Sequence, residues 1–194
     1  FDRHRLHWDA AVYYGHLNGE ILSRDDPNAP GTSLSTNVGR TVHAGVEAVV
    51  GASLALGEHG VHRLEPLVSL TLNHFKFKND TTYGNNRLPA APRYAIKGEL
   101  MYRHASGLFF GPTFDLVGRR FADFSNTYSI DSHALWGLRA GYTTPRWEVY
   151  AELRNAGDRK HVSYFSVRDV AAGNAAILNP GEPRSLFVGT RLRF

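Results

Sequence analysis

The sequence holds many residues that could do acid–base or metal chemistry, but they lack the patterns that such chemistry needs. It has ten His and no Cys, which excludes disulfides, thiolate metal sites and a catalytic thiol. No Gly-x-Ser-x-Gly elbow positions a nucleophilic serine, and no Gly-rich loop followed by Lys-Ser or Lys-Thr is present to hold a phosphate. We therefore expect that the protein is not an enzyme and has no cofactor.

Two stretches are candidate metal sites, and both have a simpler interpretation. Glu58, His59 and His62 lie at a short turn without a fourth ligand, whereas structural zinc normally has four. Asp25 and Asp26 lack the glycine-centred spacing of a calcium-binding loop. We expect these side chains to be solvated turn and loop residues, and we expect no metal site.

Composition limits the class of protein further. The formal net charge is +4, but the Lys and Arg residues form no block, so no nucleic-acid partner is expected. No run of about 18 apolar residues is present, which excludes membrane-spanning helices. A transmembrane β-barrel needs only every second residue of a strand to be apolar, so it is compatible with 42% hydrophobic residues and a mean hydropathy of −0.32.

Alternation of apolar and polar residues is the main local pattern. It is clearest over residues 41–56, where Val42, Val46 and Leu54 share one face and His43 and Glu47 share the other. Such a strand covers roughly 50 Å at about 3.3 Å per residue, whereas ordinary strands have about five or six residues. The same alternation predicts strands over residues 5–16, 64–74, 94–103, 108–117, 133–142, 147–155 and 185–194.

The connections between these strands alternate strictly in length. Short turns are expected at residues 57–60, 104–107 and 143–146, and long loops at residues 24–40, 75–93, 118–132 and 156–184. Short turns on one side and long loops on the other are typical of outer-membrane barrels. The fold class that follows is all-β: about eight antiparallel transmembrane strands, with short periplasmic turns, long extracellular loops and an apolar face toward lipid.

The ends of the chain add two expectations. Residues 185–194 alternate and finish on Phe194, which resembles the C-terminal strand of bacterial outer-membrane barrels. The chain begins at Phe1, without Met or a signal-peptide pattern, so we expect a mature fragment or the end of a longer protein.

Two alternatives to a piece of a larger barrel stay open. The strands could form a self-contained eight-stranded outer-membrane protein, either structural or a lipid-modifying enzyme with a His/Ser pair. They could also form a soluble closed barrel that binds a small apolar ligand, in which case the apolar faces would point inward.

Four segments form a recognisable set. They are Asn37-Val38-Gly39 through Gly45-Val46-Glu47, Leu88-Pro89-Ala90-Ala91-Pro92-Arg93, Glu152 to His161, and Pro180-Gly181-Glu182-Pro183-Arg184 with Phe194. These segments resemble the C-terminal part of the β-barrel in a known family, the TonB-dependent outer-membrane receptors. Their order and spacing carry the resemblance over nearly the whole chain. The third segment departs from the family pattern, because Ala156-Gly157 replaces a Leu-aromatic pair and His161 replaces a Tyr.

The resemblance implies an importer of a ferric siderophore or a similar chelate in the bacterial outer membrane. Members enclose a plug of roughly 150 residues in a 22-stranded barrel. We therefore expect residues 1–194 to be the C-terminal part of such a barrel, without its plug. The implied partners are outer-membrane lipid and lipopolysaccharide, the chelate, the rest of the barrel and the plug, and TonB only through that plug.

In such receptors the ligand meets extracellular loops and the upper lumen, where Arg and aromatic side chains hold an anionic chelate. The residues of these types that lie in the expected loops are Tyr83, Asn85, Arg87, Arg119, Arg120, Tyr128, Tyr164, Phe165 and Arg168. The alternative interpretation is ordinary polar loop surface, including charges that bind lipopolysaccharide phosphates.

Overall fold

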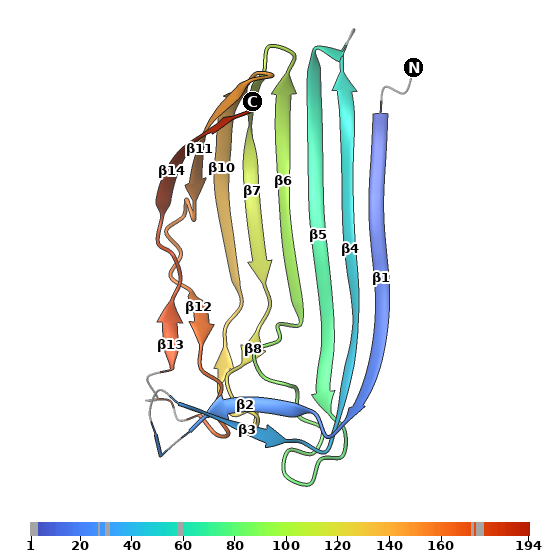
Figure 1. Ribbon diagram of the computed structural model, residues 1–194, viewed down its shortest axis with the longest axis vertical. Helices are drawn as coiled ribbons and strands as arrows, with labels where there is room; N and C mark the ends of the chain where they lie inside the picture. The colour runs from blue at the N-terminus through green and yellow to red at the C-terminus, as the bar shows by residue number, and fades with distance from the viewer. Residues whose placement is uncertain (1–3, 27, 30–31, 58–59, 172, 174–176) are drawn as a thin grey trace.

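The protein is a single large antiparallel sheet with three small hairpins at one end (Figure 1). This computed structural model describes residues 4–26, 28–29, 32–57, 60–171, 173 and 177–194. Eight long strands lie side by side in the order in which they occur along the chain: β1 (His4–Asn18), β4 (Arg40–Leu56), β5 (His62–Phe77), β6 (Tyr94–His104), β7 (Leu108–Val117), β10 (His133–Thr143), β11 (Trp147–Arg154) and β14 (Ser185–Leu192). No described helix has the length and apolar character to cross a membrane.

The eight strands expected from the alternation are all present, and the predicted fold class is confirmed. Four boundaries differ from the expectation by two or three residues. β1 ends at Asn18, β5 begins at His62 and ends at Phe77, and β14 ends at Leu192. All four differences lie at strand ends, where pairing with the neighbouring strand and not the side-chain pattern decides which residues extend the ladder.

The two ends of the sheet differ in the length of the connections between strands. The turns β4–β5, β6–β7 and β10–β11 lie at the same end as both chain termini, which is the upper end in Figure 1. All the long connections lie at the opposite end. We call these two ends the turn end and the loop end.

The long connections contain regular structure that the alternation did not predict. They form the hairpins β2 (Ile21–Asp25) with β3 (Ser33–Asn37), β8 (Arg120–Phe121) with β9 (Ser129–Ile130), and β12 (Val162–Phe165) with β13 (Leu178–Pro180). The first hairpin runs across the loop end (Figure 1). Strands this short carry too few alternating residues for a clear pattern, so packing against neighbouring loops determines where they form.

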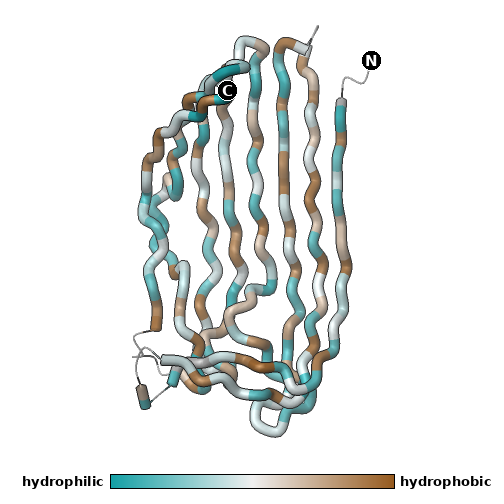
Figure 2. The backbone as a smooth tube through the Cα atoms, viewed as in Figure 1, coloured by the Kyte–Doolittle hydropathy of each residue, from teal (hydrophilic) through white to brown (hydrophobic). Residues whose placement is uncertain are grey.

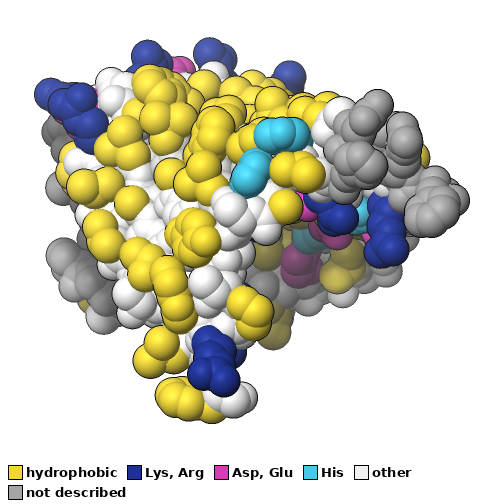
Figure 3. Space-filling view, turned by 90° about the horizontal axis from the view of Figure 1, so that it is seen from above, with side chains coloured by type: hydrophobic (Ala, Val, Ile, Leu, Met, Phe, Trp, Pro, Cys, Tyr) yellow, Lys and Arg dark blue, Asp and Glu magenta, His cyan; other side chains and the backbone are white. Residues whose placement is uncertain are grey.

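The strand register gives the large sheet one apolar face and one polar face. One row across four strands is Val12, Val46, Leu72 and Tyr94. The same strands alternate between hydrophobic and hydrophilic residues along their length in Figure 2. Apolar side chains of this face are exposed, Val12 at 81%. Seen from the turn end in Figure 3, hydrophobic side chains cover much of the outer wall, and charged side chains lie in the concavity.

The sheet is open, and its two edges are long. β1 and β14 stand at opposite ends of the strand order, and no pairing joins them within the described residues. An eight-stranded barrel closed on itself would need that pairing, so this alternative is contradicted. The soluble barrel is contradicted as well, because Val12 and the apolar residues that share its face point outward and not into a dry interior.

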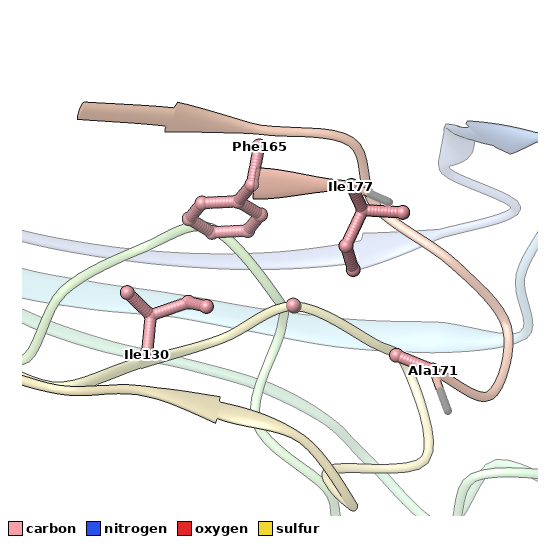
Figure 4. Packing of buried hydrophobic residues seen from close by; sticks show 5 residues of the cluster. Ile130, Phe165, Ala171 and Ile177 are labelled. Atoms are coloured by element: carbon pink, nitrogen blue, oxygen red, sulfur yellow. The ribbon is translucent and has the colours of Figure 1, made fainter. Parts of the chain in front are cut away.

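The buried hydrophobic residues gather mainly in the loops. One cluster consists of Ala122, Ile130, Phe165, Ala171 and Ile177, and a second of Val38, Phe77, Leu88 and Phe124. In the first cluster, Phe165 lies over Ile130 and beside Ile177 (Figure 4). We call the two clusters together the loop core. It holds the loop ends of strands in fixed positions, so the residues between them have a defined arrangement.

Candidate ligand-binding loops and inner wall

An aromatic group forms the centre of the second loop cluster. The Tyr83 ring lies 4.9 Å from the Phe77 ring and 5.3 Å from the Phe124 ring, measured between centroids. The Tyr83 hydroxyl donates a hydrogen bond of 2.6 Å to Oδ1 of Asp169, which joins the loop after β5 to the loop after β12. Two segments 86 residues apart in sequence are therefore fixed to each other at the loop end.

Asp123 organises the first loop cluster, although it is not among the residues predicted from the sequence. Its side chain is fully buried, and its carboxylate accepts hydrogen bonds from the backbone N–H of Thr127, Tyr128 and Ala171. The hydroxyl of Thr127 donates to the same carboxylate. Such a carboxylate stabilises the loop by satisfying amides that would otherwise be buried without partners. The signal in the sequence is an Asp followed four residues later by Thr, a pattern of local turns that is common in loops of every kind.

Asp80 plays a similar part nearer the surface. Its carboxylate accepts hydrogen bonds from the backbone N–H of Gly39, Thr82 and Tyr83 at 2.9–3.2 Å. Burial alone would raise the pKa of Asp80, but these three amides favour the ionised form and hold its pKa below the ordinary value. The bond to Gly39 ties the loop after β5 to the base of the β2–β3 hairpin.

Two of the candidate arginines are partly buried at the loop end. Nη2 of Arg120 donates a 2.6 Å hydrogen bond to the Val162 carbonyl, and its guanidinium lies 5.2 Å from the centre of the Phe165 ring. Burial lowers the pKa of Arg120. Burial also lowers the pKa of Arg87, and the nearby charge of Arg93 adds to that effect. Arginine stays charged after such shifts, so both side chains place positive charge within the loops.

The structure separates the nine predicted binding residues by exposure. Tyr164 is 64% exposed, the Arg119 side chain is 64% exposed with an ion pair to Asp131 of 3.8 Å, and Asn85 is exposed as well. Phe165 is buried at 7%. The other five, which are half-buried, are Tyr83, Arg87, Arg120, Tyr128 and Arg168. All nine lie at the loop end, and whether they contact a ligand stays a prediction.

Below the loops, the polar face of the sheet borders a cavity of about 570 Å³. The charged residues that line it are Lys97, Glu99, Asp115, Glu152, Arg154 and Glu182. Opposite charges pair on this face, both between strands and within one strand. Nζ of Lys97 lies 3.4 Å from Oδ2 of Asp115 on the next strand, and Nε of Arg154 lies 2.8 Å from Oε1 of Glu152 on the same strand. This inner wall is therefore polar and water-compatible.

A second network of charges lies on the same face nearer the turn end. Glu148 is 8% exposed and pairs with Arg139 at 3.8 Å and with Arg193 at 3.2 Å. Arg139 also lies over the rings of Tyr150 and Phe109, with its guanidinium 5.4 Å and 5.7 Å from their centres. Cation–π contacts and ion pairs thus link β7, β10 and β11 with the end of β14 and rigidify the wall.

The described residues contain no group of three or more His, Asp or Glu side chains that could hold a metal ion. Of the two candidate stretches, Glu58 and His59 lie outside the described residues, as does the side chain of Asp25. Nδ1 of His62 lies 2.6 Å from the Tyr102 hydroxyl, and Asp26 accepts a hydrogen bond from the backbone N–H of Asn28. These two side chains have ordinary polar partners.

A comparison with protein-family models matches residues 1–156 to the family described as TonB dependent receptor-like, beta-barrel. The match covers most of the chain. The chain belongs to the TonB-dependent receptors. Members of this family reside in the bacterial outer membrane, and they are transporters and not enzymes. The resemblance inferred from the four sequence segments is confirmed, although residues 157–161 of the third segment and the whole of the fourth lie beyond the match.

Solved receptors share the fold. The ferric yersiniabactin uptake receptor FyuA from Yersinia pestis has a TM-score of 0.71 at 21% identity over 97% of this chain and 28% of its own. The unliganded ferric citrate transporter FecA has a TM-score of 0.74 at 21% identity over 100% and 30%. The copper transporter OprC has a TM-score of 0.70 at 20% identity over 97% and 28%. The chain thus spans less than a third of the length of these receptors.

Proposed function

We propose that this chain is the C-terminal part of a receptor barrel and that the intact receptor imports a metal chelate of the siderophore type across the outer membrane. The observation that carries the first part is the open sheet. β1 has 15 residues and pairs with β4 along one edge only. Among the described residues, no strand pairs with the backbone N–H and C=O groups along its other edge. Unpaired backbone groups within a bilayer cost several kcal/mol each. The sheet therefore needs further strands beside β1 and β14, which the rest of the receptor would supply.

The loop end supports the second part. The loop end carries aromatic surface and positive charge. Tyr164 and Arg119 are exposed there, and Arg87 and Arg120 are half-buried. Aromatic and guanidinium groups suit an anionic chelate, because the first supply contact area and the second supply charge. FyuA and FecA are named for ferric yersiniabactin and ferric citrate, which agrees with a ferric chelate as ligand. OprC is named as a copper transporter, so copper belongs in the test.

The remaining partners follow from the same proposal. The lumen would enclose a plug supplied elsewhere in the receptor, and TonB would act on that plug and not on this chain. Lipid and lipopolysaccharide would cover the apolar face and the loop rim. Among the candidate arginines Arg119 is the exposed one, so its guanidinium would meet the chelate or a phosphate group of lipopolysaccharide.

Uptake by cells in which the intact receptor is the sole chelate importer tests the proposal. Labelled iron would be supplied as catecholate, hydroxamate and carboxylate chelates, with labelled copper in parallel, with and without an active TonB system. We expect TonB-dependent uptake of one ferric class. Tyr164→Ala should weaken that uptake about tenfold, as expected for loss of an aromatic anchor. Tyr142→Ala removes a Tyr at the turn end and should leave chelate affinity unchanged.

Uptake of no iron chelate in the presence of TonB would contradict the ligand class. Uptake of copper alone would mean that the substrate is a metal ion and not a ferric chelate. Equal losses in Tyr164→Ala and Tyr142→Ala would reject the loop end as the binding region while leaving the receptor function intact.

A further inference from the structure

Two histidines lie opposite each other on the apolar, outer face of the sheet at the turn end. His62 on β5 and His104 on β6 are partners in the strand register, and the centres of their rings are 5.1 Å apart. Each lies two residues from an apolar residue of that face, Leu64 or Tyr102, and therefore shares the face. His62 is exposed and His104 is half-buried. Figure 3 shows imidazole side chains beside hydrophobic ones at this end.

One nitrogen of each ring is already in use. The backbone N–H of Ser106 donates a 3.1 Å hydrogen bond to Nδ1 of His104, and the Ser106 hydroxyl lies 2.8 Å from the same nitrogen. Nδ1 of His62 lies 2.6 Å from the hydroxyl of Tyr102, which is the better hydrogen donor of the two groups. With Nδ1 as the acceptor in both rings, the neutral imidazoles have their proton on Nε2.

The two Nε2–H groups are donors without an acceptor among the residues that the structure describes. This tautomer does not suit a metal ion, because a metal-binding imidazole normally donates through its other nitrogen, and here that nitrogen accepts. It suits an anionic oxygen. Ring centres 5.1 Å apart allow both donors to reach the oxygens of one phosphate group.

The surroundings of the two histidines favour a lipid as the source of that phosphate. The next row away from the turn end contains Leu64, Tyr102 and Phe110, and the rings of Tyr102 and Phe110 lie 4.9 Å apart. Aromatic rings on the outer face of such barrels lie at the level of the lipid headgroups. The histidines, one row closer to the turn end, are therefore at the level of the phosphates.

A free phosphate ion fits this position less well. The neighbour of His62 on its other side is Leu56, so the row supplies two neutral donors and no Lys or Arg to offset the dehydration of a small anion. A phospholipid also brings acyl chains, which can cover the apolar row, where Phe110 is 49% exposed.

We propose that His62 and His104 form a binding site for the phosphodiester group of a phospholipid in the leaflet at the turn end. Their Nε2–H groups donate to its non-bridging oxygens, and Leu64, Tyr102 and Phe110 contact the adjoining glycerol and acyl chains. The inference goes beyond the proposed function, because it needs only the membrane location and not a particular imported substrate.

Photocrosslinking of the intact receptor in a maltoside detergent, which contains no phosphate, tests the site. The probe is phosphatidylglycerol with a diazirine in the acyl chain next to the glycerol. Mass spectrometry measures the crosslink yield at residues 60–66 and 100–110, with crosslinks to the other strands as the internal reference. The competitors are unlabelled phosphatidylglycerol, a galactosyl diacylglycerol with the same acyl chains, and inorganic phosphate.

Three double variants accompany the wild type. His62→Ala with His104→Ala removes both donors. His62→Gln with His104→Gln keeps an N–H group near the position of each Nε2. His133→Ala with His161→Ala is the matched control, because these two rings also lie close together, with centres 4.7 Å apart, but at the loop end.

In the wild type, phosphatidylglycerol should displace the probe at about tenfold lower concentration than the galactolipid, as expected for hydrogen bonds to a charged acceptor. The alanine pair should lower the crosslink yield by about the same factor and lose this preference. The glutamine pair should keep most of both, and the control pair should match the wild type. The reference crosslinks should be unchanged in every variant.

Equal competition by the two lipids in the wild type, or an unchanged yield in the alanine pair, would overturn the proposal. Equal losses in the glutamine and alanine pairs would reject the two N–H groups as the binding groups. Displacement of the probe by millimolar inorganic phosphate would mean that the site takes a free anion and not a lipid. Loss of the crosslink in EDTA, with recovery on adding Zn²⁺, would reassign the two histidines to a metal ion.

Discussion

The eight-stranded sheet, which we call the wall, exposes its hydrophobic residues, whereas the loop core buries them. In the wall, apolar side chains such as Leu138 and Leu192 are 47% and 65% exposed on the outer face. In the loop core, Phe77 and Phe124 are 0% and 1% exposed. The charged side chains of the wall lie on its inner face, whereas those of the loops range from exposed Arg119 to fully buried Asp123. Two solvents therefore act on one chain, lipid around the wall and water around the loops.

The comparison separates two sources of stability. The loop core gains free energy by removing apolar surface from water, as any globular domain does. The wall gains by pairing backbone groups between adjacent strands in a medium that offers no other partner, and its apolar side chains only need to match the lipid. Substitutions of the same chemical kind should consequently have different effects in the two regions.

The largest effect is expected for Phe124→Ala in the loop core. Truncating a fully buried Phe costs about 3–5 kcal/mol, through lost burial and the cavity left behind. The loss should appear as faster hydrogen exchange of the loop amides around residues 77–88 and 121–130, while the exchange of β4 and β5 stays unchanged. Phe187→Ala is the matched control, since Phe187 is 42% exposed on the inner wall. If loops and wall lost protection together, the two regions would be one cooperative unit and the comparison would fail.

The next effect concerns the face of the wall. Leu138→Arg places a charge on the lipid-facing side of β10 and should lower the free energy of unfolding in lipid vesicles by about 2–4 kcal/mol. Leu135→Arg makes the same change on the same strand but on the inner face, where Leu135 borders the polar cavity. Urea titration of the two variants measures the difference. Equal destabilisation would mean that both faces meet the same medium, contrary to the assignment of lipid and lumen.

The sequence predicted the structure well where lipid on one face of a strand requires apolar and polar residues to alternate. In β4, alternation from Val42 to Leu56 determined the strand and its outer face, because one face meets lipid along the whole membrane-spanning length. The alternation of short turns and long loops then predicted which connections lie at the same end of the sheet. Whether the sheet closes depends on pairing between β1 and β14, and no property of either strand alone reports it.

The loop end was only partly predictable. Arg120 and Tyr83 were selected by residue type, but their contacts with Val162 and Asp169 join segments far apart in sequence. Asp123 was missed because its partners are backbone amides, which every residue type offers. Loop cores of this kind are built from long-range contacts, and a single sequence has no local signal for them.

A smaller effect is expected at a glycine of the wall that packs closely against the neighbouring strands. At Gly141 on β10, an added Cβ would overlap the Val149 carbonyl oxygen and the Phe109 ring, which lies against this glycine from the next strand. Gly141→Ala should therefore cost about 1–3 kcal/mol through overpacking. Gly15→Ala on β1 is the control, because its nearest neighbours stay at 3.6 Å or more. Comparable stability of the two variants in urea would show that the ring moves aside and does not hold the register.

The smallest effect is expected from pH, and it should be confined to the loops. Three hydrogen bonds from backbone amides hold the pKa of Asp80 in the folded protein below its ordinary value of 3.8, so ionisation of Asp80 stabilises the loop above that pH. The contribution is lost as the pH falls through the lower, folded pKa, when the protonated carboxyl accepts the bonds more weakly. Hydrogen exchange of the Gly39, Thr82 and Tyr83 amides should accelerate in this range beyond the intrinsic pH dependence, while amides of β4 should not respond.

In Asp80→Asn, which stays neutral, these amides should exchange faster at neutral pH and lose the extra acceleration in acid. The same acid response in both proteins would assign it to other carboxylates.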